Sequence, residues 1–225
     1  LQRSRPPQPL PPPARSPTMS KFKPRCRLYL QVAAPFTARL ESQLSQALSD
    51  VSPACVLICG ADEQLEPTAL DGLIDRVHGA GAACLIESAN EACADLGADG
   101  VHIAADQILY AEARKVLGES ANIGVGCGLD RHEAMALAES GADYVAFGAP
   151  GSGDFEALSD TIAWWSELFV VPSVAWDSTV IGAAERLTEL GVDFIAPPRT
   201  IWDSDAALDS LRDMDRAIGS IRRNA

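Results

Sequence analysis

The 225-residue sequence lacks a long apolar segment, although 47% of its residues are hydrophobic. No apolar run approaches the roughly 20 residues that cross a bilayer, and the first residues contain no apolar core of the kind that a signal peptide carries. We therefore expect a cytoplasmic protein with one ordinary domain, large enough to bury a sizeable core.

Positive charge is scarce, and the formal net charge is −13. Lys and Arg crowd residues 21–27, but few follow before Arg199. An acidic surface of this kind repels nucleic acid and anionic membranes, so neither is expected as a partner. The cations between Arg27 and Arg199 are Arg39, Arg76, Arg114, Lys115, Arg131 and Arg186.

The six cysteines form no CxxC pair. Without a secretory signal, a disulfide framework is not expected. Cys55 and Cys59 share one face of a predicted strand at a separation of ~13 Å, which is too far for a shared metal ion. We expect all six cysteines to be small buried hydrophobic residues.

Proline, in contrast, is abundant in the first 24 residues. Because Pro fixes φ and donates no hydrogen bond, residues 1–24 are expected to form a disordered or polyproline-like tail. The folded domain then comprises residues 25–225. Met19 lies inside the tail, and translation from it would leave out residues 1–18.

Short apolar runs alternate with amphipathic segments along the rest of the chain. Near-continuous apolarity is typical of parallel strands that are buried on both faces. Eight such runs are present: 27–33, 54–60, 83–88, 100–104, 122–128, 143–148, 171–177 and 193–198. Helical patterns between them include 36–48, 65–78, 107–117, 131–139, 161–168, 179–190 and 206–221.

Eight strands in alternation with helices predict a (β/α)₈ TIM barrel. The alternative is a doubly wound open sheet, but that fold usually has a glycine-rich phosphate turn after its first strand. No GxGxxG follows residues 27–33. A Gly-x-Asp pattern recurs at Gly97, Gly141 and Gly191, and its Asp is expected to serve a structural role at the amino-terminal face of the barrel.

The functional site of such a barrel lies at the carboxyl ends of its strands. Glu87 and Asp106 end adjacent strands there, so they could hold one Mg²⁺ together with substrate phosphates; two solvated loop carboxylates are the alternative. Arg199 is the best cation for an anionic ligand, with Ser152 and Asp177 as further substrate or phosphate contacts. His102 is expected to be a packed, hydrogen-bonded histidine near the mouth rather than a metal ligand or base.

Two segments carry a family resemblance. Residues 83–106 read ACLIESANEACADLGADGVHIAAD, and residues 123–150 read IGVGCGLDRHEAMALAESGADYVAFGAP. Their order and spacing resemble thiamine phosphate synthase and its relative, the TenI thiazole tautomerase, from about residue 26 to 202. The resemblance implies a (β/α)₈ barrel that joins hydroxymethylpyrimidine diphosphate to a thiazole phosphate, releases pyrophosphate and needs Mg²⁺.

This chain departs from the family pattern at most strand ends. Acidic residues follow the second strand where the family has Gln-x-Arg-x-Lys, and Glu87-Ser88 replace Asn-Asp, whose Asp binds Mg²⁺. Asp106 is the nearest counterpart of a carboxylate that the family has one place later. The other changes are Gly126 for Ser, residues 151–155 for a Thr-x-Thr-Lys loop, residues 176–178 for a Gly-Gly turn, and Gly128 for the tautomerase His.

The six changes from the synthase pattern lie at one face and suggest an altered or impaired site, because a diphosphate needs cations that this mouth lacks. The expected function is therefore a thiamine phosphate synthase-like activity, degenerate at its active site. The alternative is a non-catalytic barrel that binds or senses a small phosphorylated or heterocyclic molecule. A homo-oligomer is possible if one ring of the pair Trp164-Trp165 lies at an interface.

Overall fold

The computed structural model describes residues 25–33, 36–60, 67–148, 154–176 and 181–221. The expected tail, residues 1–24, lies outside the described residues, as do Ser152 and Asp177. Within the described ranges, no helix combines the length and the apolar character needed to cross a membrane.

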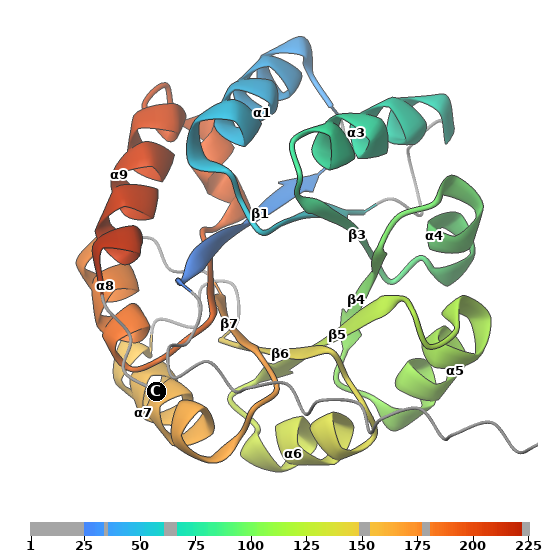
Figure 1. The fold of residues 1–225 in the computed structure, drawn as a ribbon, viewed down its shortest axis with the longest axis vertical. Coiled ribbons are helices and arrows are strands. Elements are labelled where there is room, and N and C mark those ends of the chain that lie inside the picture. Colours follow the sequence, from blue (N-terminus) through green and yellow to red (C-terminus); the bar gives the residue numbers. More distant parts are fainter. Residues whose placement is uncertain (1–24, 34–35, 61–66, 149–153, 177–180, 222–225) are drawn as a thin grey trace, which may run out of the picture.

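Eight parallel strands form a closed barrel in chain order (Figure 1). Each strand pairs with the next, and β8 pairs with β1. This closure confirms the predicted (β/α)₈ barrel and excludes the open sheet. The strands are β1 (Arg27–Ala33), β2 (Cys55–Cys59), β3 (Ala83–Glu87), β4 (Gly100–Ala104), β5 (Asn122–Gly128), β6 (Tyr144–Phe147), β7 (Ser173–Trp176) and β8 (Phe194–Ala196).

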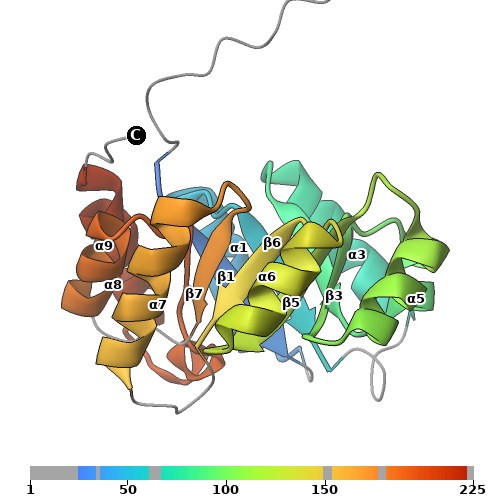
Figure 2. The ribbon, with the colours of Figure 1, turned by 90° about the horizontal axis from the view of Figure 1, so that it is seen from below.

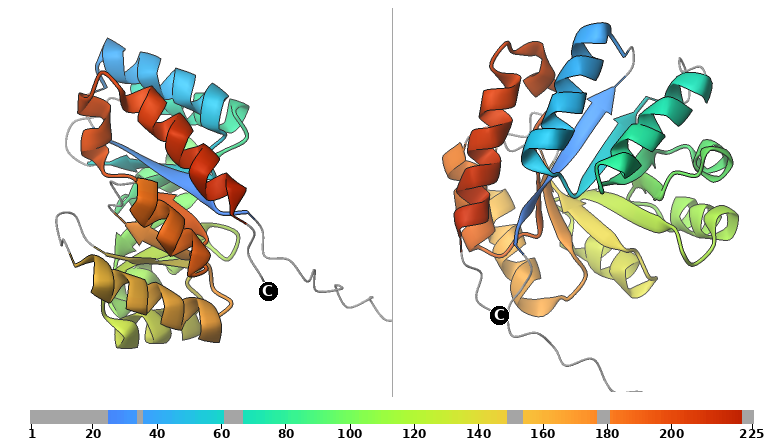
Figure 3. Two further views of the ribbon diagram at one scale, coloured as in Figure 1. Left: turned by 90° about the vertical axis from the view of Figure 1, so that its left-hand side faces the viewer. Right: turned by 45° about the horizontal axis from the view of Figure 1, so that its top comes forward.

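Helices surround the barrel on its outside (Figures 1 and 2). The last helix packs against both α1 and α8, which closes the ring of helices next to the first strand (Figure 3). The helices are α1 (Ala38–Val51), α3 (Pro67–Gly79), α4 (Asn90–Leu96), α5 (Gln107–Leu117), α6 (Arg131–Glu139), α7 (Phe155–Leu168), α8 (Ile181–Glu189), the 3-10 helix η1 (Arg199–Asp203) and α9 (Ala207–Ser220).

Two apolar clusters follow from the alternation of side chains along the strands. One cluster lies between the strands and the surrounding helices. The other fills the barrel itself, and it comprises Tyr29, Cys55, Leu57, Cys59, Leu85, Tyr144, Ala146, Val174 and Ala196. All six cysteines are free and buried, as predicted.

The recurring Gly-x-Asp pattern holds the start of alternate strands. The carboxylates of Asp99, Asp143 and Asp193 accept hydrogen bonds from the backbone N–H groups of Cys84, Ile123 and Ser173, at 2.7, 2.8 and 2.9 Å. Each Asp N–H also donates to the carbonyl of that same strand residue. The predicted structural role at the amino-terminal face is therefore confirmed.

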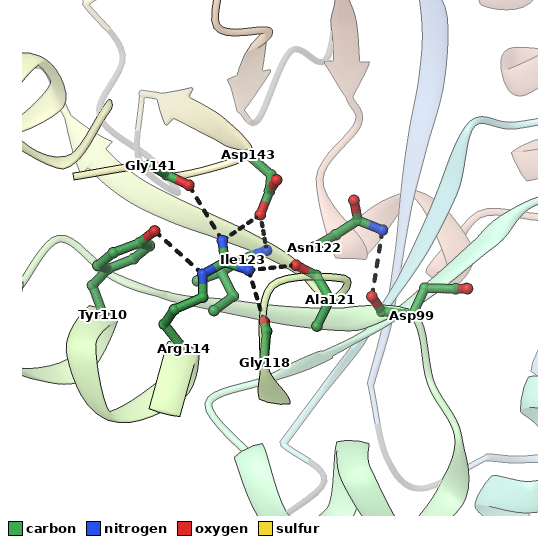
Figure 4. Close-up of polar contacts among 9 residues, drawn as sticks. All are labelled: Asp99, Tyr110, Arg114, Gly118, Ala121, Asn122, Ile123, Gly141 and Asp143. Carbon is green, nitrogen blue, oxygen red and sulfur yellow. Dashed lines mark hydrogen bonds and ion pairs between the residues drawn. The ribbon is translucent and has the colours of Figure 1, made fainter. Parts of the chain in front are cut away.

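Arg114 joins several loops at this amino-terminal face (Figure 4). Its guanidinium donates to the carbonyls of Gly118, Ala121 and Gly141 and to the carboxylate of Asp143. Only 14% of the side chain is exposed. Arg114, one of the few cations between Arg27 and Arg199, therefore has a structural role at the end of the barrel opposite to the one where ligands bind.

The adjacent tryptophans of α7 have different surroundings. Trp165 is 1% exposed, and its indole N–H donates to the Val171 carbonyl at 2.8 Å. Trp164 is partly buried, and the Arg131 guanidinium lies 4.8 Å from its ring centre. The core position expected for one ring is confirmed for Trp165, while the interface role of the other stays a prediction.

Candidate active site at the mouth of the barrel

A pocket of about 330 Å³ opens at the carboxyl ends of the strands. Its lining comes from β3 to β7, which are neighbours in the barrel. Three of the lining residues, Gly126, Gly128 and Gly148, carry no side chain, so the other lining residues supply all the side-chain contacts. The lining residues are Glu87, Ser88, His102, Ile103, Ala104, Gly126, Gly128, Ala146, Gly148 and Trp176.

His102 and Trp176 form a stacked pair in this pocket. Their ring centres are 4.7 Å apart, and the planes are inclined by 20°. Below them, His102 Nδ1 shares a hydrogen bond of 2.9 Å with the Tyr144 hydroxyl. That hydroxyl bonds to the hydroxyl of Tyr29 at 2.8 Å, deeper in the barrel. The predicted packed and hydrogen-bonded state of His102 is confirmed.

Burial keeps these polar rings neutral. Desolvation lowers the pKa of His102 from its ordinary value of 6.5 to about 4. The same cause raises the pKa of Tyr29 and Tyr144 well above 10.0. At neutral pH the three side chains therefore form an uncharged hydrogen-bonded chain that starts in the barrel core and ends at the pocket.

The second ring nitrogen of His102 lies beside Gly126. A Cβ added at Gly126 would be 3.1 Å from His102 Nε2, so the glycine keeps this nitrogen uncovered. Gly126 stands where the resembled family has Ser. In the described part of the chain, no side chain hydrogen-bonds to Nε2, which leaves it available to a ligand in the pocket.

Glu87, Cys59 and Arg199 meet at the ends of β3, β2 and β8. The Gly60 N–H donates to Glu87 Oε2 at 3.2 Å. Burial raises the pKa of Cys59 to about 12, the negative charge of Glu87 adds to the rise, and the Arg199 guanidinium opposes it. Two of the predicted site residues, Glu87 and Arg199, thus share Cys59 as a neighbour.

Asp106 caps helix α5. Its Oδ1 accepts from the backbone N–H groups of Ile108 and Leu109 at 2.7 and 2.9 Å. Glu87 lines the mouth pocket, but Asp106 is not among its lining residues; what the two share with a magnesium site is that both are carboxylates, which such a cation prefers. Over the described residues, no group of three or more His, Cys, Asp or Glu side chains is placed to hold a metal.

Three aromatic residues of this region were not anticipated as site residues. Trp176 was noted only in its strand and as part of the changed turn at residues 176–178, and Tyr144 and Tyr29, which lie below the pocket, were not singled out. The available signal was alternation: Tyr144 belongs to the cluster that fills the barrel, and Trp176 packs against that cluster, so both occupy inward positions. Ser88 is also unusual, because its φ of 55° is rare for a residue other than glycine and marks local strain beside the pocket.

These features define a (β/α)₈-barrel protein with a ligand pocket at the carboxyl ends of its strands, the face where such barrels carry their chemistry. The comparisons with known proteins agree with this class. The chain of a thiamine phosphate pyrophosphorylase from Pyrococcus furiosus superposes with a TM-score of 0.69 at 14% identity, covering 85% of this chain and 95% of that one. A geranylgeranylglyceryl phosphate synthase from Thermoplasma acidophilum gives 0.64 at 12% identity, covering 87% and 94%.

Sequence comparison identifies the family. Residues 61–201 match the family model described as thiamine monophosphate synthase. A thiamine-phosphate synthase of Rhodospirillum centenum is 34% identical over 80% of this chain and 91% of its own length. Another, from Erythrobacter litoralis, is 35% identical over 78% and 86%. The chain belongs to the thiamine monophosphate synthase family.

Proposed function

We propose that this protein makes thiamine phosphate from hydroxymethylpyrimidine diphosphate and a thiazole phosphate, with release of pyrophosphate. Relatives named thiamine-phosphate synthase over about four fifths of the chain support the proposal. The observation that carries it is the stack of His102 and Trp176, because a flat aromatic wall in a concave pocket suits a heterocyclic substrate.

The reaction exchanges one bond for another. A C–N bond forms between the pyrimidine methylene carbon and the thiazole nitrogen, and the C–O bond to the diphosphate breaks. Pyrophosphate leaves with the electron pair of that bond. In this proposal the Arg199 guanidinium stabilises the growing negative charge on the leaving group.

The neutral state of His102 suits it to positioning rather than to charge neutralisation. Tyr144 fixes one ring nitrogen, so Nε2 is held toward Gly126 and can hydrogen-bond a substituent of the substrate ring. Glu87 and Asp106 are the carboxylates that would hold Mg²⁺. When bound, the metal supplies positive charge to the diphosphate.

Titration calorimetry of hydroxymethylpyrimidine diphosphate in Mg²⁺ buffer tests the proposal. Aromatic stacking contributes about 0.5–1.5 kcal/mol, so we expect Trp176→Leu to weaken binding roughly threefold to tenfold. Trp164→Leu is the matched control, because that ring packs outside the barrel on Arg131. Equal affinity for wild type and Trp176→Leu would contradict the assigned site, and no binding by the wild type would contradict the function.

A further inference from the structure

A second pocket, of about 470 Å³, lies beside the mouth between the start of α1 and η1. We call it the β8–α1 pocket. Its polar lining is formed by Thr37, Arg39, Gln43, Arg199, Thr200 and Asp203. Two of the few cations between Arg27 and the last helix therefore come together here, although they are 160 residues apart in the chain.

We infer that the β8–α1 pocket binds the phosphoryl end of the substrate, with Arg39 and Arg199 as its cationic donors. The inference rests on the proposed function for the identity of the ligand. Guanidinium groups recognise phosphate oxygens through two parallel hydrogen bonds, which makes arginine pairs suitable for phosphate and diphosphate. The pair would replace the basic residues that the acidic stretch after β2 no longer supplies.

Arg199 connects this pocket to the mouth. It lines the β8–α1 pocket and also contacts Cys59, which Glu87 contacts as well. Glu87 in turn lines the pocket of His102 and Trp176. A phosphorylated heterocycle can therefore place its ring on the aromatic wall and direct its phosphoryl group past Arg199.

Both arginines are available to an anion. Within the described ranges, no carboxylate lies within ion-pair distance of Arg199. Arg39 pairs with Asp205 at 2.9 Å, but that carboxylate is 99% exposed. Exposed pairs of this kind contribute little, so a diphosphate can compete for the guanidinium. Asp203 is exposed at the rim and opposes an anion.

The first turn of α1 adds donors that carry no formal charge. Thr37 caps this 14-residue helix by accepting from the Leu40 N–H at 3.2 Å. The cap leaves the N–H groups of residues 38 and 39 at the positive end of the helix, where anions bind favourably.

Gln43, one turn further on, also lines the pocket. Its Oε1 is buried and has no hydrogen-bond partner in the described part of the chain. A hydrogen-bond donor on the ligand, such as a hydroxyl group or a protonated phosphoryl oxygen, would give Gln43 Oε1 a partner. This acceptor is a second and independent indication of a polar ligand.

Binding of inorganic pyrophosphate in metal-free buffer, measured by calorimetry at fixed ionic strength, tests the inference. We expect Arg39→Gln and Arg199→Gln each to weaken binding at least tenfold, and Asp203→Asn to tighten it. Arg186→Gln is the matched control, because it removes the same charge from an exposed pair on α8. Thermal melting of each variant verifies that it is folded.

The outcomes separate this inference from the proposed function. If the wild type does not bind pyrophosphate, or if wild type and Arg39→Gln bind it equally, the β8–α1 pocket is not a phosphoryl site. This conclusion holds even if the protein makes thiamine phosphate. Weakened binding in Arg39→Gln and Arg199→Gln, with Arg186→Gln unchanged, supports the pocket even if no product forms.

Discussion

Gly124→Ala is expected to destabilise the barrel strongly. A Cβ at this position would lie 1.8 Å from Cζ of the Tyr144 ring, with two further ring atoms within 2.4 Å. Gly124 and Tyr144 are register partners on β5 and β6, so the ring occupies the space that a side chain at 124 would fill. Tyr144 would have to leave its position between Tyr29 and His102.

Overpacking of a core costs typically about 1–3 kcal/mol, and a contact this short places Gly124→Ala near the upper end. For a domain of this size, about 3 kcal/mol lowers Tm by roughly 6–12 °C. Differential scanning calorimetry measures the change. A smaller side chain at 144 removes the overlap, so the double variant Gly124→Ala/Tyr144→Leu should lose less stability than the two single changes together.

Gly72→Ala is the matched control, because Gly72 lies inside α3 and a Cβ there would meet nothing within 4 Å. Alanine in a helix interior is favoured over glycine by about 1 kcal/mol, so this variant should melt slightly above the wild type. A Tm for Gly124→Ala equal to that of the wild type would show that Tyr144 is not held against Gly124.

The second large effect is a loss of stability in acid that depends on His102. The folded protein keeps this side chain neutral down to about pH 4, whereas its ordinary pKa is 6.5. Between these values the unfolded chain binds a proton that the folded protein excludes, so the free energy of unfolding falls as the pH falls. At about 1.4 kcal/mol per pKa unit, the contribution of His102 to this fall is about 3 kcal/mol between pH 6.5 and 4.

Urea unfolding at several pH values between 7 and 4.5 tests this expectation. His102→Gln cannot take up the proton, so its free energy of unfolding should fall less steeply with acid than that of the wild type. His132→Asn, a change at an exposed histidine on α6, is the matched control. Parallel curves for wild type and His102→Gln would contradict the burial of a neutral imidazole.

The arrangement of strands and helices was largely predictable, because each signal was local. Short, near-continuous apolar runs predicted all eight strands. Helix α4 was not among the predicted segments. It has seven residues and buries only Cys93, so it carries almost no apolar periodicity.

The contents of the pocket were harder to predict, because they depend on contacts between strands. The pairing of His102 with Trp176 joins β4 to β7, and no local pattern relates residues so far apart. The Tyr144 ring occupies the space left by the missing side chain of Gly124. From sequence alone, a glycine in a strand that makes room for a neighbour looks the same as one that forms a bend or a bulge. Arg39 and Arg199 are far apart in the chain, and only the closure of β8 on β1 brings them to the same pocket.

The central claim, that this barrel makes thiamine phosphate, is tested most directly by measuring both products of one reaction. The purified protein is mixed with hydroxymethylpyrimidine diphosphate, thiazole phosphate and Mg²⁺, and pyrophosphate and thiamine phosphate are quantified over time. We predict that the two products appear in equal amounts and that both require the protein. Saturable binding of the diphosphate without either product would contradict the claim and indicate a barrel that binds this ligand without converting it.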